Sequence, residues 1–277
     1  MTTRTDRIRA VRAAVIGLAC SLVGCATAEA PMVYHNRNPN QSPLVQWPKP
    51  TGEVQVDATI RILSGAHFDG KMQRYYGIDD MATSSQDENQ DPMFRLSDGA
   101  VLENVIIGDP AADGIHCYGS CTLKNVWWER VGEDAATFRG QEPDDVMIID
   151  RGGASGAKDK VFQNNGVGTM IIKNFYVEQF GKLYRSCGNC SRQAARKVVL
   201  ENIIAVAGHK SSCLVGLNEN YGDEAVFKGL NQIFIAAKPK FPVCQRFIGN
   251  ARGLEPKKTT TGPDDHCRYT DASVTIK

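Results

Sequence analysis

An asparagine recurs inside short apolar segments, and this repeat constrains the fold more than any other feature of the chain. Four segments share the pattern, namely 101–107 (VLENVII), 122–128 (TLKNVWW), 170–176 (MIIKNFY) and 199–204 (VLENII). Their asparagines are Asn104, Asn125, Asn174 and Asn202, and a strand-like run at 145–150 divides the widest interval into two nearly equal steps. Strand-rich segments that recur roughly every 20 to 30 residues are typical of a solenoid.

The repeat predicts an all-β fold, a right-handed parallel β-helix. One turn of the chain cannot bury its inner face alone, so stacked turns would share a continuous core. The asparagines would then stack at a bend, with their amides hydrogen-bonded from turn to turn along an internal ladder. A β-sandwich also has closely spaced strands, but the asparagine inside each apolar run favours the solenoid. Further strands are expected at 58–63, 66–70, 92–97, 145–150 and 225–235.

The N-terminus carries the pattern of an export signal. Four arginines within residues 4–12 precede an apolar run at 13–23 that is too short to span a bilayer stably, and small residues follow. Residues 22–25 (LVGC) also resemble a bacterial lipobox, in which Cys25 would carry a lipid anchor; the alternative is ordinary cleavage after Ala28. We therefore expect a secreted protein with a signal at 1–25, a flexible leader at 26–53 and a folded domain at 54–277.

Cysteine usage supports export, because seven of the nine cysteines lie beyond the signal. The pairing we favour is Cys117 with Cys121, Cys187 with Cys190, and Cys244 with Cys267, which leaves Cys213 free and buried. Connectivity cannot be deduced from the sequence alone. Zinc is the alternative for the motif at 187–190 (CGNC), but it would need a second such pair or nearby histidines, for which the candidates are His116 and His209.

Three carboxylates near predicted strand ends form the first candidate site. Asp113 lies in an Asp-Gly turn, and Glu133 and Asp134 follow the 122–128 strand by a few residues. Asp113 precedes them by about one turn, so stacking would bring the three together. Adjacent residues of a regular strand face opposite sides, so Glu133 and Asp134 can act together only at a bend, which Gly132 favours. Such a cluster suits a hard cation, whereas most acidic residues are simply solvated at the surface.

Five motifs then carry a resemblance to a known family: 113–119 (DGIHCYG), 125–129 (NVWWE), 132–135 (GEDA), 159–163 (DKVFQ) and 181–185 (GKLYR). Over about residues 54–275 the chain resembles the secreted pectate lyases of the third polysaccharide lyase family. The resemblance implies a parallel β-helix, Ca²⁺ dependence and cleavage of de-esterified homogalacturonan (polygalacturonate) by β-elimination. Two positions depart from the family pattern, since Arg130 replaces an expected acid and Arg139 replaces the usual lysine.

The resemblance also implies roles for individual residues. Ca²⁺ would bind Glu133, Asp134 and Asp113, with Asp159 and Glu88 as further candidates, and would neutralise the substrate carboxylate. Lys160 would remove the C5 proton, its pKa lowered from about 10.4 by the nearby Ca²⁺ and an arginine. Arg185 would grip the substrate carboxylate through its planar fork. Weaker candidates for other subsites are Lys182, Arg139 and Arg151.

Two other functions remain open at this stage. A polygalacturonase-type hydrolase would use carboxylates and water without a metal, and it would leave Lys160 and Arg185 without a role. A non-catalytic surface protein that binds acidic polysaccharide would tolerate the loss of Lys160. The near-neutral formal charge of +1 argues against a nucleic-acid binder that works by its overall field, and we expect a monomer. His116 is expected to make a structural hydrogen bond, and one of Trp127 and Trp128 to lie in the core.

Overall fold

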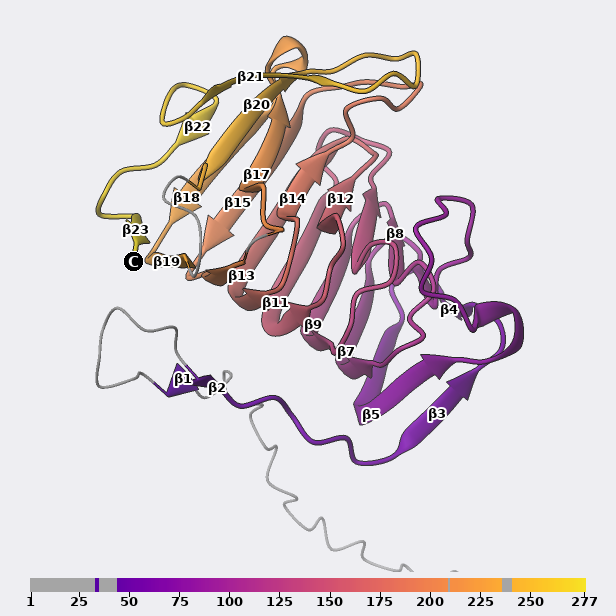
Figure 1. Ribbon diagram of the computed structural model, residues 1–277. Coiled ribbons are helices and arrows are strands. Elements are labelled where there is room, and N and C mark those ends of the chain that lie inside the picture. Colours follow the sequence, from indigo (N-terminus) through magenta and orange to yellow (C-terminus); the bar gives the residue numbers. More distant parts are fainter. Residues whose placement is uncertain (1–32, 35–43, 209, 236–240) are drawn as a thin grey trace, which may run out of the picture.

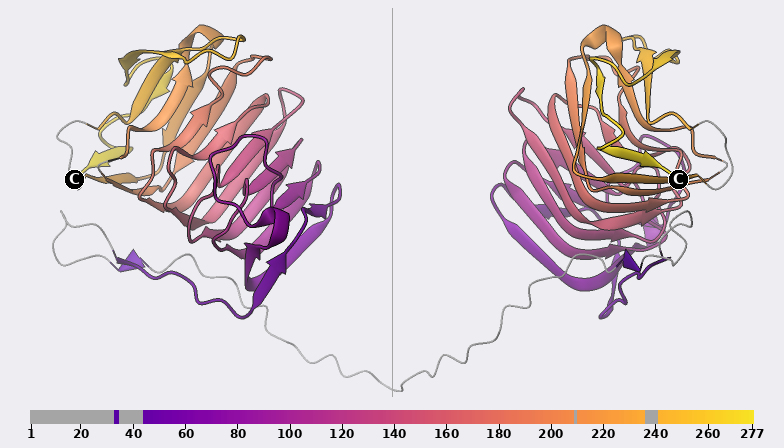
Figure 2. Two further views of the ribbon diagram at one scale, coloured as in Figure 1. Left: turned by 45° about the vertical axis from the view of Figure 1, so that its right-hand side comes forward. Right: turned by 90° about the vertical axis from the view of Figure 1, so that its left-hand side faces the viewer.

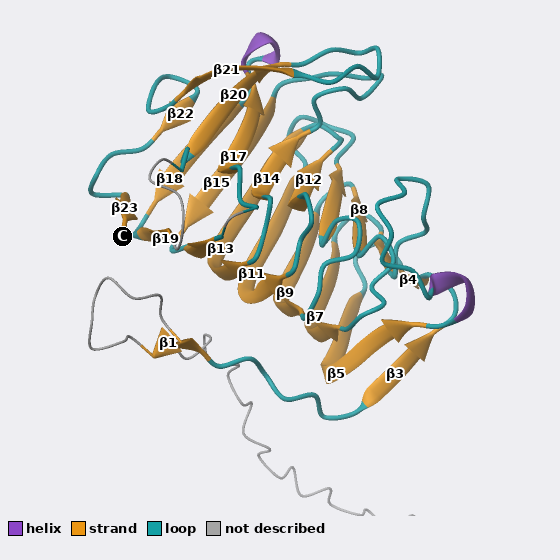
Figure 3. Ribbon diagram, viewed as in Figure 1, coloured by secondary structure: helices purple, strands orange, loops and turns teal. Residues whose placement is uncertain are grey.

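The computed structural model describes residues 33–34, 44–208, 210–235 and 241–277 (Figure 1). The predicted signal and Cys25 lie outside these residues. In the described part the chain is almost entirely strand and loop (Figure 3), with two 3₁₀ turns, η1 (Asp79–Met81) and η2 (Glu219–Tyr221). No helix among these residues is long and apolar enough to cross a membrane.

Two parallel sheets run the length of the domain, and their strands alternate along the chain. The nine-stranded sheet of the described residues contains β4 (Ile60–Ile62), β6 (Phe94–Leu96), β8 (Ile115–Tyr118), β10 (Ala136–Arg139), β12 (Lys160–Asn164), β14 (Lys182–Ser186), β17 (Cys213–Asn218), β20 (Cys244–Ile248) and β21 (Lys257–Thr261). The second sheet contains β3 (Glu53–Val56), β5 (His67–Gly77), β7 (Ala100–Ile107), β9 (Cys121–Trp128), β11 (Val146–Ser155), β13 (Gly168–Glu178), β15 (Arg196–Glu201), β18 (Glu224–Lys228) and β22 (Cys267–Arg268), extended by β16 (Ile204–Ala207), β19 (Asn231–Ile235) and β23 (Val274–Ile276). A separate pair, β1 (Val33–Tyr34) and β2 (Leu44–Val45), is antiparallel.

From β4 to β13, each turn of the chain consists of a short strand in the first sheet and a long strand in the second, and the second-sheet strands are shorter toward the C-terminus. Figure 2 shows the successive turns stacked behind one another. Every strand of one turn pairs in parallel with its counterpart in the next, as β8 does with β10 and β9 with β11, while β21 pairs with β20 in the antiparallel direction. This arrangement confirms the predicted parallel β-helix. The predicted strands coincide with β4 to β7, β9, β11, β13, β15, β18 and β19, whereas the short strands from β8 to β17 were not predicted.

The repeated asparagines stand where the long strands bend. Asn104, Asn125, Asn174 and Asn202 all have φ near +54°, in the left-handed region that asparagine tolerates better than most residues. Their amides bond from turn to turn: Asn125 donates to Asn104 at 2.9 Å, and Asn202 donates to Asn174 at 3.2 Å. The residue after each asparagine, such as Val105 or Val126, turns into the core.

The expectation of an internal ladder is wrong in one respect, because the amides lie on the outside of the bend and are half-buried or exposed. Inside an apolar core, the first and last amides of the stack would each bury a polar group without a hydrogen-bond partner, which costs free energy. The ladder is also interrupted at β11, where Arg151 (φ +65°) occupies the bend in register between Asn125 and Asn174. There Asn174 donates instead to Asp150 Oδ1 at 3.0 Å.

Aromatic side chains fill the interior at the centre of the helix. Trp128, Phe162 and Phe175 pack edge-to-face with ring centroids 5.2–6.3 Å apart. Trp128 is therefore the predicted core tryptophan. Trp127 faces the other side, where it contacts Trp47 with centroids 5.2 Å apart and donates a hydrogen bond to Asn125. Trp47 belongs to the expected leader, so residues of that segment contact the domain; the boundary at residue 53 stays a prediction.

The three predicted disulfides are present. They join Cys117 to Cys121, Cys187 to Cys190 and Cys244 to Cys267, and Cys213 is a buried free thiol. The first two close short loops at the ends of β8 and β14, and the third ties the C-terminal segment to β20. The zinc alternative for Cys187 and Cys190 is thereby excluded.

Candidate active site

Parallel register brings the predicted acids together. Asp113, Asp134 and Lys160 each lie two residues before a position that is paired across β8, β10 and β12 (Ile115, Ala136 and Phe162). They therefore stack where these strands begin. Two glycines permit the close approach of the turns: a Cβ on Gly114 (φ +53°) would lie 2.4 Å from the Asp134 carbonyl, and one on Gly132 would lie 2.0 Å from the Ala112 carbonyl.

The carboxylates of Asp113, Glu133 and Asp134 form an acidic trio, with one oxygen of each within 4.8 Å of the others. All three are at least 94% buried. The buried Oδ1 atoms of Asp113 and Asp134 have no hydrogen-bond partner. Burial and the charge of Asp113 raise the pKa of Glu133. Burial and the charges of Glu133 and Asp113 raise the pKa of Asp134, and Lys160 opposes both shifts. Oxygen ligands in such crowding suit a divalent cation that would restore the charge balance.

Lys160 projects from the start of β12 into the trio. Its Nζ lies 3.2 Å from Glu133 Oε1, 3.6 Å from Asp134 Oδ1 and 3.3 Å from Asp159 Oδ2. Burial lowers the pKa of Lys160, but the three carboxylates outweigh burial, so the pKa lies above its ordinary value. The lowering expected beside a bound Ca²⁺ and an arginine stays a prediction; without such a cation, the three acids set the direction of the shift.

Two polar side chains contact the trio and orient its acids. His116 Nε2 lies 2.8 Å from Asp113 Oδ2, and Thr137 Oγ1 donates to Asp134 Oδ2 at 3.3 Å. Both residues follow their acid by three positions, on β8 and β10. The expected structural hydrogen bond of His116 is thus made to a candidate metal ligand, and this spacing is the sequence signal that would have placed His116 and Thr137 at the site.

Asp159 and Glu88 are not members of the trio. The Asp159 side chain is about half exposed and binds Lys182 Nζ at 2.5 Å in addition to Lys160. Although burial raises the pKa of Asp159, the two lysines outweigh it and lower that pKa. Glu88 is exposed in the loop before β6 and lines a surface depression with His116. The sequence alone does not show that Asp159 and Glu88 lie outside the trio, because the positions of both side chains depend on how the loops fold.

Arg185, on β14, is buried and lies one turn beyond Lys160. Its Nη1 donates to Asn218 Oδ1 at 2.9 Å and to the Gly216 carbonyl at 3.4 Å, and its guanidinium stacks on Phe247 at 4.1 Å from the ring centroid. Among the described residues, no carboxylate lies within ion-pair distance of Arg185. Burial lowers its pKa. Sequence reasoning did not find Asn218 and Phe247, which lie 33 and 62 positions further along the chain.

The remaining predicted cations lie in three different places. Lys182 is paired with Lys160 across β12 and β14, close to the trio. Arg139 ends β10 and faces Tyr118, whose ring also stacks on Arg95 with Arg95 Cζ 4.2 Å from the centroid. Tyr118 and Arg139 line two adjoining depressions of about 220 and 540 Å³, and the smaller one reaches His116. Arg151 instead occupies the bend of β11 described above.

Comparison with known proteins identifies the family. The pectate lyase family model matches residues 45–253. The chain belongs to the pectate lyase family. A probable pectate lyase D of Emericella nidulans is 42% identical over 225 residues, which cover 81% of this chain and 82% of that protein. Pectate lyase H of the same fungus is 43% identical over 229 residues, covering 81% and 83%.

Solved pectate lyase structures agree with the fold. The catalytic domain of pectate lyase PelI from Erwinia chrysanthemi superposes with a TM-score of 0.66 at 32% identity, covering 81% of this chain and all of that one. PelI in complex with tetragalacturonic acid superposes with a TM-score of 0.64 at 31% identity, covering 80% and 70%. The predicted family, fold and class of enzyme, a pectate lyase, are confirmed.

Proposed function

We propose that the acidic trio binds Ca²⁺ and that this pectate lyase cleaves de-esterified homogalacturonan by β-elimination beside it. The observation that carries the proposal is the pair of buried Oδ1 atoms, on Asp113 and Asp134, that have no hydrogen-bond partner. Hard oxygen donors of this kind fit Ca²⁺, which accepts irregular oxygen geometry. Bound there, Ca²⁺ would neutralise the substrate carboxylate and so make the C5 proton more acidic.

Lys160 is the proposed base. Its Nζ accepts the C5 proton of a galacturonate unit, the electrons of that C–H bond form the C4–C5 double bond, and the C4–O bond breaks with its pair on the leaving oxygen, which then takes up a proton. Lys160 acts as the base in its neutral amine form, and a cation held by Glu133 and Asp134 would favour that form. In this structure the same acids hold Nζ in place beside the reaction site.

Arg185 is proposed to bind the carboxylate of the reacting unit. A guanidinium suits this task because it stays charged and presents paired donors. Here its charge is not matched by any carboxylate within ion-pair distance in the described chain, while Nη1 is already bonded to protein. The same donors would stabilise the charge that develops as the C5 proton leaves.

A groove for the polymer would extend from the trio past His116 to Tyr118 and Arg139. Arg139 is proposed to contact a further substrate carboxylate there, and Lys182, one turn beyond Lys160, is proposed to contact another on the opposite side of the trio. Lys182 also fixes Asp159, so we propose Asp159 as an outer residue that holds the two lysines, and Glu88 as a residue of the groove rim. Arg151 is not included in this groove because of its place at the asparagine bend.

The same proposal extends to the processing and oligomeric state of the whole protein. We propose an exported monomer with a signal at 1–25, a leader at 26–53 and a lyase domain at 54–277. Three disulfides fit an oxidising compartment. A lipid anchor on Cys25 is open to direct test, since mass spectrometry of the mature N-terminus distinguishes lipidated Cys25 from cleavage after Ala28.

One assay tests the proposed function. Polygalacturonate is incubated with the enzyme, and the ultraviolet absorbance of the unsaturated product is followed with Ca²⁺ and then with a chelator. Absorbance that rises only with Ca²⁺ is the expected result. New reducing ends without absorbance would instead indicate the hydrolase, and binding without turnover would indicate the non-catalytic alternative.

A further inference from the structure

The guanidinium of Arg185 lies in a pocket that four residues form around it, namely Gly188, Gly216, Asn218 and Phe247. Two of them are glycines that leave room for it. A Cβ on Gly216 would lie 2.7 Å from Arg185 Cδ, and one on Gly188 would lie 2.4 Å from Nη2. Both contacts are far shorter than van der Waals distance, so side chains at these positions would displace the arginine. Phe247 covers one face of the guanidinium.

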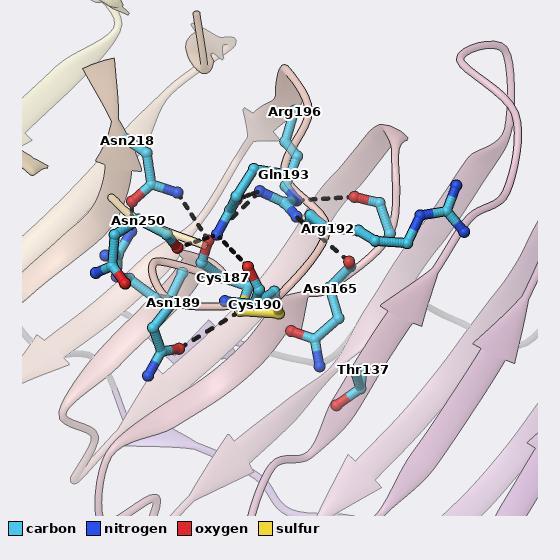
Figure 4. The surroundings of a disulfide bond; sticks show 12 residues. Thr137, Asn165, Cys187, Asn189, Cys190, Arg192, Gln193, Arg196, Asn218 and Asn250 are labelled. Carbon is cyan, nitrogen blue, oxygen red and sulfur yellow. Dashed lines mark hydrogen bonds between the residues drawn. A yellow bond between two sulfur atoms is a disulfide. The ribbon is translucent and has the colours of Figure 1, made fainter. Parts of the chain in front are cut away.

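Asn218 is the polar member of this pocket, and its hydrogen bonds tie three parts of the fold together. It is fully buried. Its Oδ1 accepts from Arg185 Nη1 at 2.9 Å, and its Nδ2 donates to the Cys187 carbonyl at 2.9 Å (Figure 4). Its own backbone N–H donates to Asp223 Oδ2 at 2.8 Å. The amide therefore joins the arginine to the loop closed by the Cys187–Cys190 disulfide.

We propose that Asn218 is a positioning residue for Arg185, fixing Nη1 so that Nε and Nη2 are presented to a galacturonate carboxylate. Neither Nε nor Nη2 hydrogen-bonds to a described residue. The chemistry favours an amide here, because a neutral oxygen orients the guanidinium without cancelling its charge, whereas a carboxylate would compete with substrate. This inference rests on the proposed role of Arg185.

A double-mutant cycle provides the test. Asn218→Ala should lower kcat/KM for polygalacturonate about 10- to 100-fold, as expected when a reacting group is misplaced by an ångström or less. In an Arg185→Ala background the same change should cost less than about threefold, because residues that act through one another are not additive. Asn220→Ala is the matched control: exposed Asn220 also makes two amide hydrogen bonds, with Gly249, but does not touch Arg185.

Asn218→Asp keeps the shape of the side chain, so it provides a second test of the positioning role if the alanine variant does not fold. Its carboxylate would pair with Arg185 but would lose the hydrogen bond donated to the Cys187 carbonyl. KM should therefore rise more than kcat falls, and a cooperative melting transition, at a temperature lowered by the lost bond, checks that the variant is folded. Equal losses from Asn218→Ala in both backgrounds, or a KM unchanged in Asn218→Asp, would overturn the positioning role. Full activity of Arg185→Ala would instead refute the proposed function of Arg185 itself, so the two failures are distinguishable.

Discussion

The asparagine bend and the acidic trio both arise from a polar residue repeated at one register position, yet they meet their hydrogen-bonding needs in opposite ways. At the bend, Asn125 donates to Asn104, which donates to Asp69, so each amide supplies a donor and an acceptor. In the trio, carboxylates that are acceptors only face one another, and two of their oxygens, on Asp113 and Asp134, lack a hydrogen-bond partner. Stacked amides satisfy one another, whereas stacked carboxylates need a cation or a donor from elsewhere.

The two regions also shift carboxyl pKa values in opposite directions. The hydrogen bond from Asn104 lowers the pKa of Asp69, which is mostly exposed. Burial raises the pKa of Asp134, and the neighbouring acids add to the effect. The ladder therefore stabilises its charged end, while the trio holds charge that the folded chain alone compensates poorly. In this β-helix, a stack whose donors and acceptors match is structural, whereas a stack with an excess of acceptors is suited to bind a cation.

The largest expected effect is that of removing Lys160. In Lys160→Ala, kcat on polygalacturonate should fall about 10²- to 10⁴-fold, the usual contribution of a general base, while the polymer still binds. Lys173→Ala is the matched control, since Lys173 also lies near a carboxylate (Asp150 Oδ2, 3.4 Å) but at the bend. Steady-state absorbance assays and a binding isotherm measure both. A variant with full activity would remove Lys160 from the mechanism.

Replacing an acid of the trio should weaken Ca²⁺ binding and yet spare the metal-free fold. Asp134→Asn should raise the Ca²⁺ concentration for half-maximal activity at least tenfold, because a charged ligand is lost. In the presence of a chelator, the melting temperature of the variant should be no lower than that of the parent, because a buried carboxylate beside two others has been removed. A gain of ~1 kcal/mol would raise it by about 2–4 °C in a domain of this size.

Calorimetric melting with and without Ca²⁺ makes the measurement for Asp134→Asn. The parent should gain stability with Ca²⁺ in proportion to its occupancy, and the variant should gain much less. A variant that melts far below the parent in chelator would show that Asp134 stabilises the metal-free fold. The trio would then be a structural stack, like the asparagine ladder.

A break in the ladder should act on stability and leave catalysis intact. Asn125→Ala removes three hydrogen bonds, those donated to Asn104 and to the Met72 sulfur and the one accepted from Trp127, and places alanine at φ +55°. The expected loss is about 1–3 kcal/mol in the free energy of unfolding, with kcat at 25 °C within twofold of the parent. Asn125→Gly separates the two causes, since glycine relieves the strain but not the lost bonds. A tenfold fall in kcat without a change in unfolding would contradict the division of roles.

The sequence predicts the ladder and the trio because both follow from stacking at one register position. Asp113 lies about one turn before the adjacent Glu133 and Asp134, and Asn104 and Asn125 share one local pattern. The first-sheet strands from β8 to β17 escaped prediction because segments such as Ile115–Tyr118 show no recognisable period. The partners of Arg185 escaped for another reason: Asn218 meets it only through the register of β14 and β17. The sign of the pKa shift of Lys160 depends on three distances that no motif contains.

The smallest expected effect concerns the acidic end of the ladder. Because its pKa is lowered in the folded state, Asp69 contributes stability above its unfolded pKa of about 3.9, and this contribution is lost as pH falls through the folded-state pKa. Asn104→Ala removes the largest cause of that lowering, so the pKa of Asp69 should rise toward its ordinary value in a carboxyl NMR titration. Asn202→Ala, at the other end of the row, should leave that titration unchanged, since its bond is to Asn174. An unchanged Asp69 in Asn104→Ala would mean that the backbone N–H of Lys71, which also bonds it at 2.9 Å, sets its charge, and the contrast between the two stacks would then rest on hydrogen-bond balance alone.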